Sequence, residues 1–167
     1  HAFDHKKISG SSIFVREAKE GEKITTLDDQ QRELNPKMLV IADSEKPLVI
    51  AGIMGSVDAE VDANTIDIVL ESACFHPGSV RSTARTLGLH TDSSQRFSRD
   101  VDPQGVEYAA KRAIDLILEI AGGTTSEEFV SIGQPPRGSR CIEIESDYVE
   151  ETCGFEVTHD ELIESWQ

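Results

Sequence analysis

Residues 38–55, Met-Leu-Val-Ile-Ala-Asp-Ser-Glu-Lys-Pro-Leu-Val-Ile-Ala-Gly-Ile-Met-Gly, carry the strongest structural signal in the chain. Two apolar runs, Met38 to Ala42 and Leu48 to Ile53, flank a polar turn that ends in Pro47. Short runs rich in Val and Ile, bounded by turn residues, are typical of buried strands. We therefore expect two core strands here, the second of which ends at Met54-Gly55.

Further strands are expected on both sides of this stretch. The alternation of apolar and polar residues predicts that Val15 faces inward, and it places Ile66, Ile68 and Leu70 together on one face of the clearest strand. The expected strands are residues 13–18, 23–27, 31–34 and 65–75. The strands at residues 23–27 and 31–34 should pair as a hairpin.

Two helices should pack on these strands. Pro77 opens the first, which Gly88 can end as a left-handed cap. The second runs from Pro103 to Ile120, with Asp102 as its cap and apolar residues at helical spacing. We therefore predict an α+β fold with a β-rich layered core and packed helices.

The chain after this core changes in character. A Pro- and Gly-containing linker is expected at residues 133–139. It is followed by a strand at residues 140–144 and by helices at residues 146–153 and 158–166, where Thr158 and Glu161 form a capping-box pattern. This segment is too short to bury a core alone, so we expect a short, partial second domain.

The composition is that of an ordinary globular protein, with 38% hydrophobic and 28% charged residues among 167. No apolar run approaches the ~20 residues of a membrane span. Cys74, Cys141 and Cys153 are widely spaced and form no Cys-x-x-Cys pair, so neither a zinc site nor a disulfide framework is indicated. Cys74 is expected in the core, and a reducing, cytoplasmic setting fits best.

The net charge of −15 argues against broad binding of nucleic acid. The charge is uneven, because the segment from Glu143 to Gln167 contains no Lys or Arg, whereas the segment from Arg81 to Arg112 holds more Lys and Arg than Asp and Glu. Any contact with a polyanion should therefore fall in the second segment. An ordinary solvated surface explains the same pattern equally well.

The first three quarters of the chain contain an ordered set of motifs: His1–Asp4, Val40–Asp43, Leu48–Gly55, Leu70–Phe75, Arg81–Ser94, Arg96–Phe97 and Val101–Pro103. Each motif is weak alone, but their order and spacing are specific, and together they resemble the β subunit of bacterial phenylalanyl-tRNA synthetase. A looser likeness to the start of the next domain of that family, called B5, covers Ile142 to Trp166.

The resemblance implies a domain organisation and a fold. Residues 1–132 would be an N-terminally truncated B3/B4 editing domain, residues 133–139 a linker, and residues 140–167 the start of a B5-like domain. The family fold is a β-sandwich of unusual topology. The family places a threonine and an asparagine of the editing site upstream of His1, so the isolated piece is expected to edit weakly or not at all.

The resemblance also implies the function of hydrolysing tyrosine from mischarged tRNA(Phe). A hydrophobic synthetic pocket rejects an added hydroxyl only on the order of 100-fold, so a second site that requires the hydroxyl improves selection. Glu71 occupies the position of the family's hydroxyl-reading glutamate, and His1 that of the histidine near the ester. Ala51 and Gly52 match the small residues of the amino-acid pocket. No metal is expected in this site.

Other interpretations of these residues stay open from the sequence alone. A lone Glu at a strand end is usually a rim carboxylate, and Ala51-Gly52 is also typical of a tightly packed strand or a bulge. Gln95, Ser98 and Asp100 depart from the family, which usually has Gly at the position of Asp100, so a left-handed turn there would be strained. The candidate tRNA contacts are Arg81, Arg85, Arg96 and Arg99; His76 and His90 are interpreted as structural.

The parent enzyme that the resemblance implies binds the acceptor end of tRNA(Phe) and pairs with an α subunit in a heterotetramer. It uses ATP and Mg²⁺ for aminoacylation, whose site belongs to the α subunit, and no cofactor is expected in the present chain. The main rival hypothesis is a non-catalytic module that holds tRNA or the α subunit. A free-standing deacylase is a third hypothesis. A cavity joining Glu71, Ala51-Gly52 and His1 would favour editing over the module.

Overall fold

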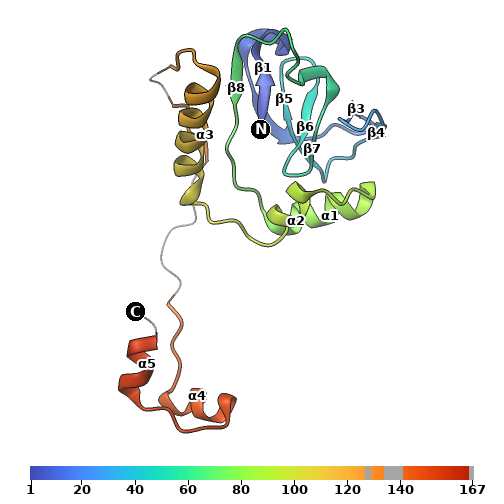
Figure 1. The fold of residues 1–167 in the computed structure, drawn as a ribbon. Coiled ribbons are helices and arrows are strands. Elements are labelled where there is room, and N and C mark those ends of the chain that lie inside the picture. The colour runs from blue at the N-terminus through green and yellow to red at the C-terminus, as the bar shows by residue number, and fades with distance from the viewer. Residues whose placement is uncertain (127–128, 134–140, 166–167) are drawn as a thin grey trace. The chain divides into compact units, whose positions relative to one another are not determined.

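The computed structural model describes residues 1–126, 129–133 and 141–165. It forms two compact units, residues 1–135 and 136–167, which are described separately (Figure 1). Helices and antiparallel sheets are both present in the first unit, so the predicted α+β class is confirmed. Of the expected linker, only Gly133 lies within the described residues.

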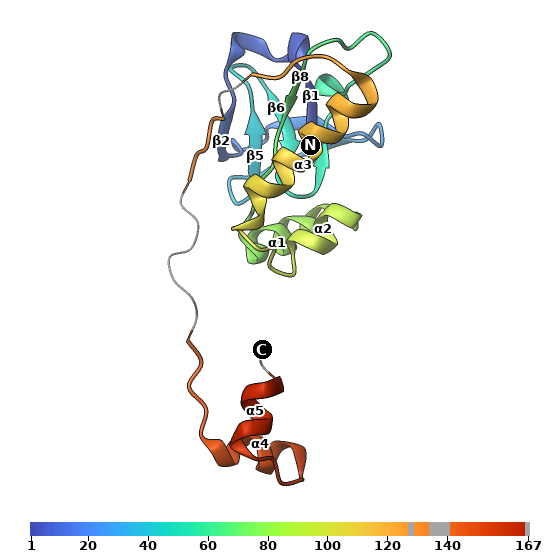
Figure 2. The same cartoon turned by 60° about the vertical axis from the view of Figure 1, so that its left-hand side comes forward.

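The first unit is built on one antiparallel four-stranded sheet and two small two-stranded sheets (Figures 1 and 2). The four-stranded sheet has the order β2 (Phe14–Glu17), β5 (Leu39–Ala42), β6 (Pro47–Ile50) and β7 (Met54–Gly55). The small sheets pair β3 (Lys23–Thr25) with β4 (Gln31–Glu33), and β1 (Ala2–Asp4) with β8 (Ile68–Leu70).

The stretch at residues 38–55 forms the centre of the core, as its sequence predicts. Val40, Leu48 and Ile50 are completely buried. Asp43 fixes the turn between β5 and β6 by accepting backbone N–H groups of Ser9, Glu45 and Lys46. Burial alone would raise the pKa of this carboxyl, but the backbone donors outweigh it and hold the pKa below its ordinary value.

Four strand expectations need correction. Val15 is exposed, because β2 is an edge strand of its sheet. β6 ends at Ile50, and residues 51–53 form a turn before β7. The strand expected at residues 65–75 is regular only over β8, because β1 offers three partner residues, and Ile66 stays exposed outside that pairing.

Helix α1 (Pro77–Leu87) is confirmed, with Pro at its first turn and Gly88 in the left-handed conformation at its end. His76 caps its start, where its side chain accepts the Ser79 N–H. Helix α2 (Asp92–Phe97) was not predicted; Thr91 and Ser94 form a reciprocal capping box at its start. The remaining short helices are η1 (His5–Lys7), η2 (Ser9–Ser11) and η3 (Val57–Ala59).

Helix α3 (Gly105–Ala121) is present but begins later than expected. Asp102 does not cap it: its carboxylate accepts the Gln104 N–H and so closes the turn that precedes the helix. Asp100 has φ +73°, which confirms that this aspartate occupies a left-handed position. Asp100 therefore has a modest backbone cost that glycine would avoid, since aspartate is among the residues that tolerate this conformation best.

The second unit contains helices α4 (Ser146–Cys153) and α5 (His159–Ser165), both predicted. The Thr158 and Glu161 capping pattern is confirmed by reciprocal hydrogen bonds. The strand expected at residues 140–144 is absent from the described part, residues 141–144, because no strand partner lies beside it there. Arg140 and Trp166 lie outside the described residues.

Two expectations from composition can also be compared with the structure. Cys74 is exposed rather than in the core, because its thiol points to the carbonyl of Val101, 3.3 Å away, in the loop before α3. Among the described residues, no helix is long and apolar enough to cross a membrane.

Candidate functional site

A cavity of about 810 Å³ opens in the first unit, where β6, the turn after it, the segment after β8, α2 and the start of α3 converge. Its volume lies in the range of small-molecule sites. Segments far apart in the sequence meet there, and their residues include His1, Gly52, Glu71, Ser93, Phe97 and Val106.

Glu71 places a carboxylate at this cavity. It follows β8 directly, and its N–H donates to the His1 carbonyl at 2.7 Å, so the two residues stand opposite one another across the β1–β8 pair. Atom Oε2 of Glu71 is buried and has no hydrogen-bond partner among the described residues. Burial raises the pKa of Glu71 above its ordinary value.

His1 lines the same cavity but is more exposed than Glu71. Its imidazole lies 4.8 Å from the ring of the buried Phe3, centroid to centroid. The ring also lies against Gly55, where a Cβ atom would approach its Cε1 atom to 2.5 Å. A side chain at this position would therefore have to displace the imidazole from its place beside the cavity.

The two small residues after β6 have different positions. Gly52 lines the cavity and has φ +70°, whereas Ala51 is buried and is not part of the cavity wall. An added Cβ at Gly52 would lie 2.9 Å from Cδ2 of Phe75 and 3.1 Å from Cγ2 of Val80. The turn thus brings backbone to the cavity where no side chain fits.

Hydroxyl groups of α2 hold this turn in place. Thr91 donates to the carbonyl of Ile53 at 2.8 Å, and Ser93 donates to that of Gly52 at 2.9 Å. Thr91 and Ser93 also line the cavity, and sequence reasoning assigned them no role. The usable signal was the Thr91-x-x-Ser94 spacing, which is typical of a helix start.

The apolar walls come from elements that the sequence did not link to the site. The rings of Phe75 and Phe97 meet edge to face, 5.0 Å apart, and both line the cavity. Across from them lie Val106 and Ala109 of α3, and the Ser72 hydroxyl donates to the Val106 carbonyl at 2.8 Å. The cavity is therefore largely apolar, with Asp28, Asp92 and Asp102 also in its wall, and it is lined by Glu71, whose Oε2 atom is buried without a partner among the described residues.

The four candidate arginines lie outside the cavity wall, on α1, on α2 and after α2. All are exposed, and Arg81 donates to the carbonyl of Ser98 at 2.7 Å. No ion pair of theirs occurs within the described part of the chain. Their guanidinium groups are therefore accessible to an external anion. His90 lies in the loop before α2 and is exposed.

The raised pKa of Glu71 predicts that its ionised carboxylate lowers the free energy of unfolding. The folded state holds the carboxyl proton more tightly than the unfolded chain, so stability is lost as the pH rises through the folded pKa. At pH 7 the Glu71→Gln variant should therefore have a higher Tm than the wild type. The gain should vanish below the ordinary pKa of glutamate, where the wild type is protonated in both states.

Thermal unfolding at several pH values measures this difference. Glu119→Gln, an exposed change on α3, serves as the control and should leave the Tm unchanged at each pH. A Glu71→Gln variant that is less stable than the wild type at pH 7 would contradict the assignment of an unpaired, buried carboxylate.

The first unit is thus an α+β domain with a largely apolar cavity, lined by a glutamate whose Oε2 atom is buried without a hydrogen-bond partner among the described residues. The model of the B3/4 domain family matches residues 1–122. The chain belongs to this B3/4 domain family.

Related proteins support the same assignment. Phenylalanine–tRNA ligase β subunits of Desulfotalea psychrophila and Carboxydothermus hydrogenoformans are 46% and 44% identical over 97% and 98% of this chain. The corresponding subunit of Aquifex aeolicus is 52% identical over 74% of it. The chain spans only about a fifth of the length of these relatives, 20%, 21% and 16% respectively.

Proposed function

We propose that this chain is the editing part of a phenylalanine–tRNA ligase β subunit and removes tyrosine from mischarged tRNA(Phe) by hydrolysis. The observation that carries the proposal is that Glu71, whose Oε2 atom is buried without a hydrogen-bond partner among the described residues, lines a largely apolar cavity. Membership of the B3/4 family and the similarity to β subunits support it.

The chemistry of Glu71 suits a reader of the tyrosine hydroxyl. A phenol is a neutral donor at pH 7, and an ionised carboxylate only accepts, so a tyrosine ring in the cavity would pair the free oxygen. Phenylalanine would bury the same oxygen without a partner, which costs about 1–3 kcal/mol or more for a charged group. The site would thus prefer the residue that the synthetic site must reject.

Hydrolysis in this proposal uses a positioned water, with neither a covalent nucleophile nor a metal ion. His1 stands opposite Glu71 at the cavity, where its imidazole would orient the water or the terminal ribose. The ester would lie near His1 and the ring would point toward Glu71. The carbonyls of Gly52 and Ile53 are already occupied by Ser93 and Thr91, so the turn beside the ring is fixed in advance.

Binding of the tRNA acceptor end is assigned to the exposed arginines. Arg81, Arg85, Arg96 and Arg99 supply the accessible cations near the cavity-lining helix α2, in a chain of net charge −15. A limited number of phosphate contacts fits this uneven charge, and such contacts weaken with salt. The same contacts would also serve a non-catalytic module that holds tRNA or the α subunit.

The parent enzyme would act with an α subunit in a cytoplasmic heterotetramer, and would use ATP and Mg²⁺ for aminoacylation. The present chain would contribute only the editing cavity. Residues 140–167 would begin the next, B5-like domain. The division of the chain into two compact units supports this assignment.

The test compares two substrates on the assembled synthetase that contains this chain. Tyrosyl-tRNA(Phe) and phenylalanyl-tRNA(Phe) are each mixed with the enzyme, without ATP, and release of the amino acid is followed. Hydrolysis of the tyrosyl ester should be faster on the order of 100-fold, because only tyrosine pairs the Glu71 oxygen. Equal rates, or tRNA binding without any hydrolysis, would favour the non-catalytic module.

A further inference from the structure

Strands β1 and β8 form a sheet of only two short strands, yet this sheet sets the geometry of the candidate site. Three residues of each strand pair, and the register places Ala2 opposite Leu70 and therefore His1 opposite Glu71. Side chains of directly opposed residues lie on the same face of a sheet. A slip by one residue would move Glu71 away from the cavity.

Hydrophobic packing anchors only one of these strands firmly. Phe3 of β1 is completely buried, whereas Ile68 of β8 is 40% exposed, and Val69 and Leu70 are half-buried. An isolated two-stranded sheet is marginally stable in water. A further anchor, besides the backbone bonds of the pair and the bond from the His5 N–H to the Asp67 carbonyl at 2.9 Å, would therefore strengthen the position of β8 along β1.

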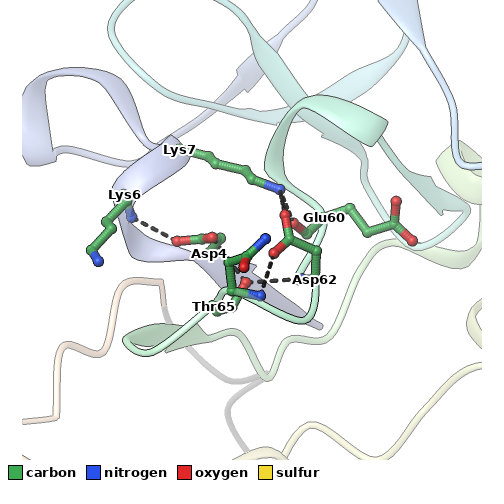
Figure 3. A network of polar contacts seen from close by, with 7 residues as sticks. Asp4, Lys6, Lys7, Glu60, Asp62 and Thr65 are labelled. Carbon is green, nitrogen blue, oxygen red and sulfur yellow. Dashed lines mark hydrogen bonds and ion pairs between the residues drawn. The ribbon is translucent and has the colours of Figure 1, made fainter.

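A polar network at the far end of the pair provides one (Figure 3). Asp4, the last residue of β1, is 5% exposed; its carboxylate accepts the Lys6 N–H and the Thr65 hydroxyl, each at 2.9 Å. The Thr65 hydroxyl also accepts the Asp62 N–H at 2.8 Å, so both of its hydrogen-bonding roles are used. Thr65 lies three residues before β8.

A second link ties the same two segments together. The Lys7 ammonium donates to the Glu60 carbonyl at 2.7 Å and to the Asp62 carboxylate at 2.8 Å (Figure 3). The Lys7–Asp62 pair is partly exposed and contributes little by itself. The Asp4–Thr65 hydrogen bond is partly buried and is the stronger element, because its loss would leave an oxygen of Asp4, a buried residue, without this partner.

We infer that Thr65 and Asp4 are positioning residues: their hydrogen bond fixes β8 on β1 and so holds Glu71 opposite His1. Neither residue lines the cavity, so they act only through the strand register. The inference rests on the proposed editing function for its effect on catalysis, but the register itself can be measured without it.

The test uses the assembled synthetase with Thr65→Val, which keeps the side-chain shape and removes the hydroxyl, and with Thr65→Ser, which restores it. The ratio of tyrosyl to phenylalanyl ester hydrolysis should fall about tenfold in Thr65→Val, since a charge-assisted hydrogen bond is lost, and return in Thr65→Ser. This ratio does not depend on the fraction of folded enzyme. Thr86→Val, which removes a local hydroxyl bond on α1, should leave it unchanged.

Hydrogen exchange supplies an independent readout. In Thr65→Val, amides of residues 67–71 should exchange faster, the Glu71 N–H among them, while those of β5 and β6 keep their protection. If both ester rates fall with an unchanged ratio and unchanged exchange, the positioning role is wrong. If the wild type hydrolyses neither ester, the proposed function fails, and the exchange result alone upholds or overturns the register assignment.

Discussion

Replacing Glu71 with alanine is expected to lower kcat/KM for tyrosyl-tRNA(Phe) hydrolysis about a hundredfold, the upper part of the range for a hydrogen bond to a charged group. Hydrolysis of the phenylalanyl ester should not fall, and should rise if its binding improves, because no carboxylate is then buried without a partner. The ratio of tyrosyl to phenylalanyl kcat/KM should therefore fall, because the first value decreases and the second does not.

A glutamate-to-alanine substitution away from the cavity serves as the control for Glu71→Ala. Glu119→Ala removes an exposed glutamate from α3 and should leave both rates as in the wild type. Steady-state rates with each ester, measured on the assembled synthetase, give the two kcat/KM values. A Glu71→Ala variant that keeps its preference for tyrosine would remove Glu71 from the role of hydroxyl reader.

The second large effect is expected from Gly52→Ala, which should reduce the free energy of unfolding by about 3 kcal/mol. A left-handed residue with a side chain costs about 1–2 kcal/mol, and overpacking a well-filled core adds about 1–3 kcal/mol. Both penalties apply here, because Gly52 has φ +70° and its Cβ would lie 2.9 Å from Cδ2 of Phe75.

Gly21 allows the two penalties to be separated. It has φ +69°, close to that of Gly52, but no atom lies within 4 Å of its added Cβ. Gly21→Ala should therefore show only the backbone cost, about 1 kcal/mol. Denaturant unfolding of both variants measures the difference. Equal losses at the two positions would mean that Phe75 does not pack against the turn at Gly52.

The core strands were predictable because their sequence has one interpretation. Val40 and Leu48 lie in runs of apolar residues bounded by a turn, and burial follows directly. Val15 was placed wrongly because alternation does not distinguish a buried face from the exposed face of an edge strand. The 65–75 strand was overextended for a related reason: its length depends on β1, its distant partner.

The candidate site was predictable only in its individual residues. The resemblance selected His1, Glu71 and Gly52, which line the cavity, and Ala51, which does not. The walls depend on long-range packing that no local pattern encodes. Phe97, for example, reaches the cavity from a helix that sequence reasoning missed.

The position of the phenol oxygen of a bound tyrosyl group decides whether Glu71 reads that hydroxyl. A crystal structure of the assembled synthetase with a non-hydrolysable tyrosyl-adenosine analogue would locate it. We expect a tyrosine ring in the cavity with its oxygen about 2.5–3.0 Å from Oε2 of Glu71, the distance of an O–H···O hydrogen bond. A ring bound with its oxygen directed away from Glu71, or an analogue bound outside the cavity, would contradict it.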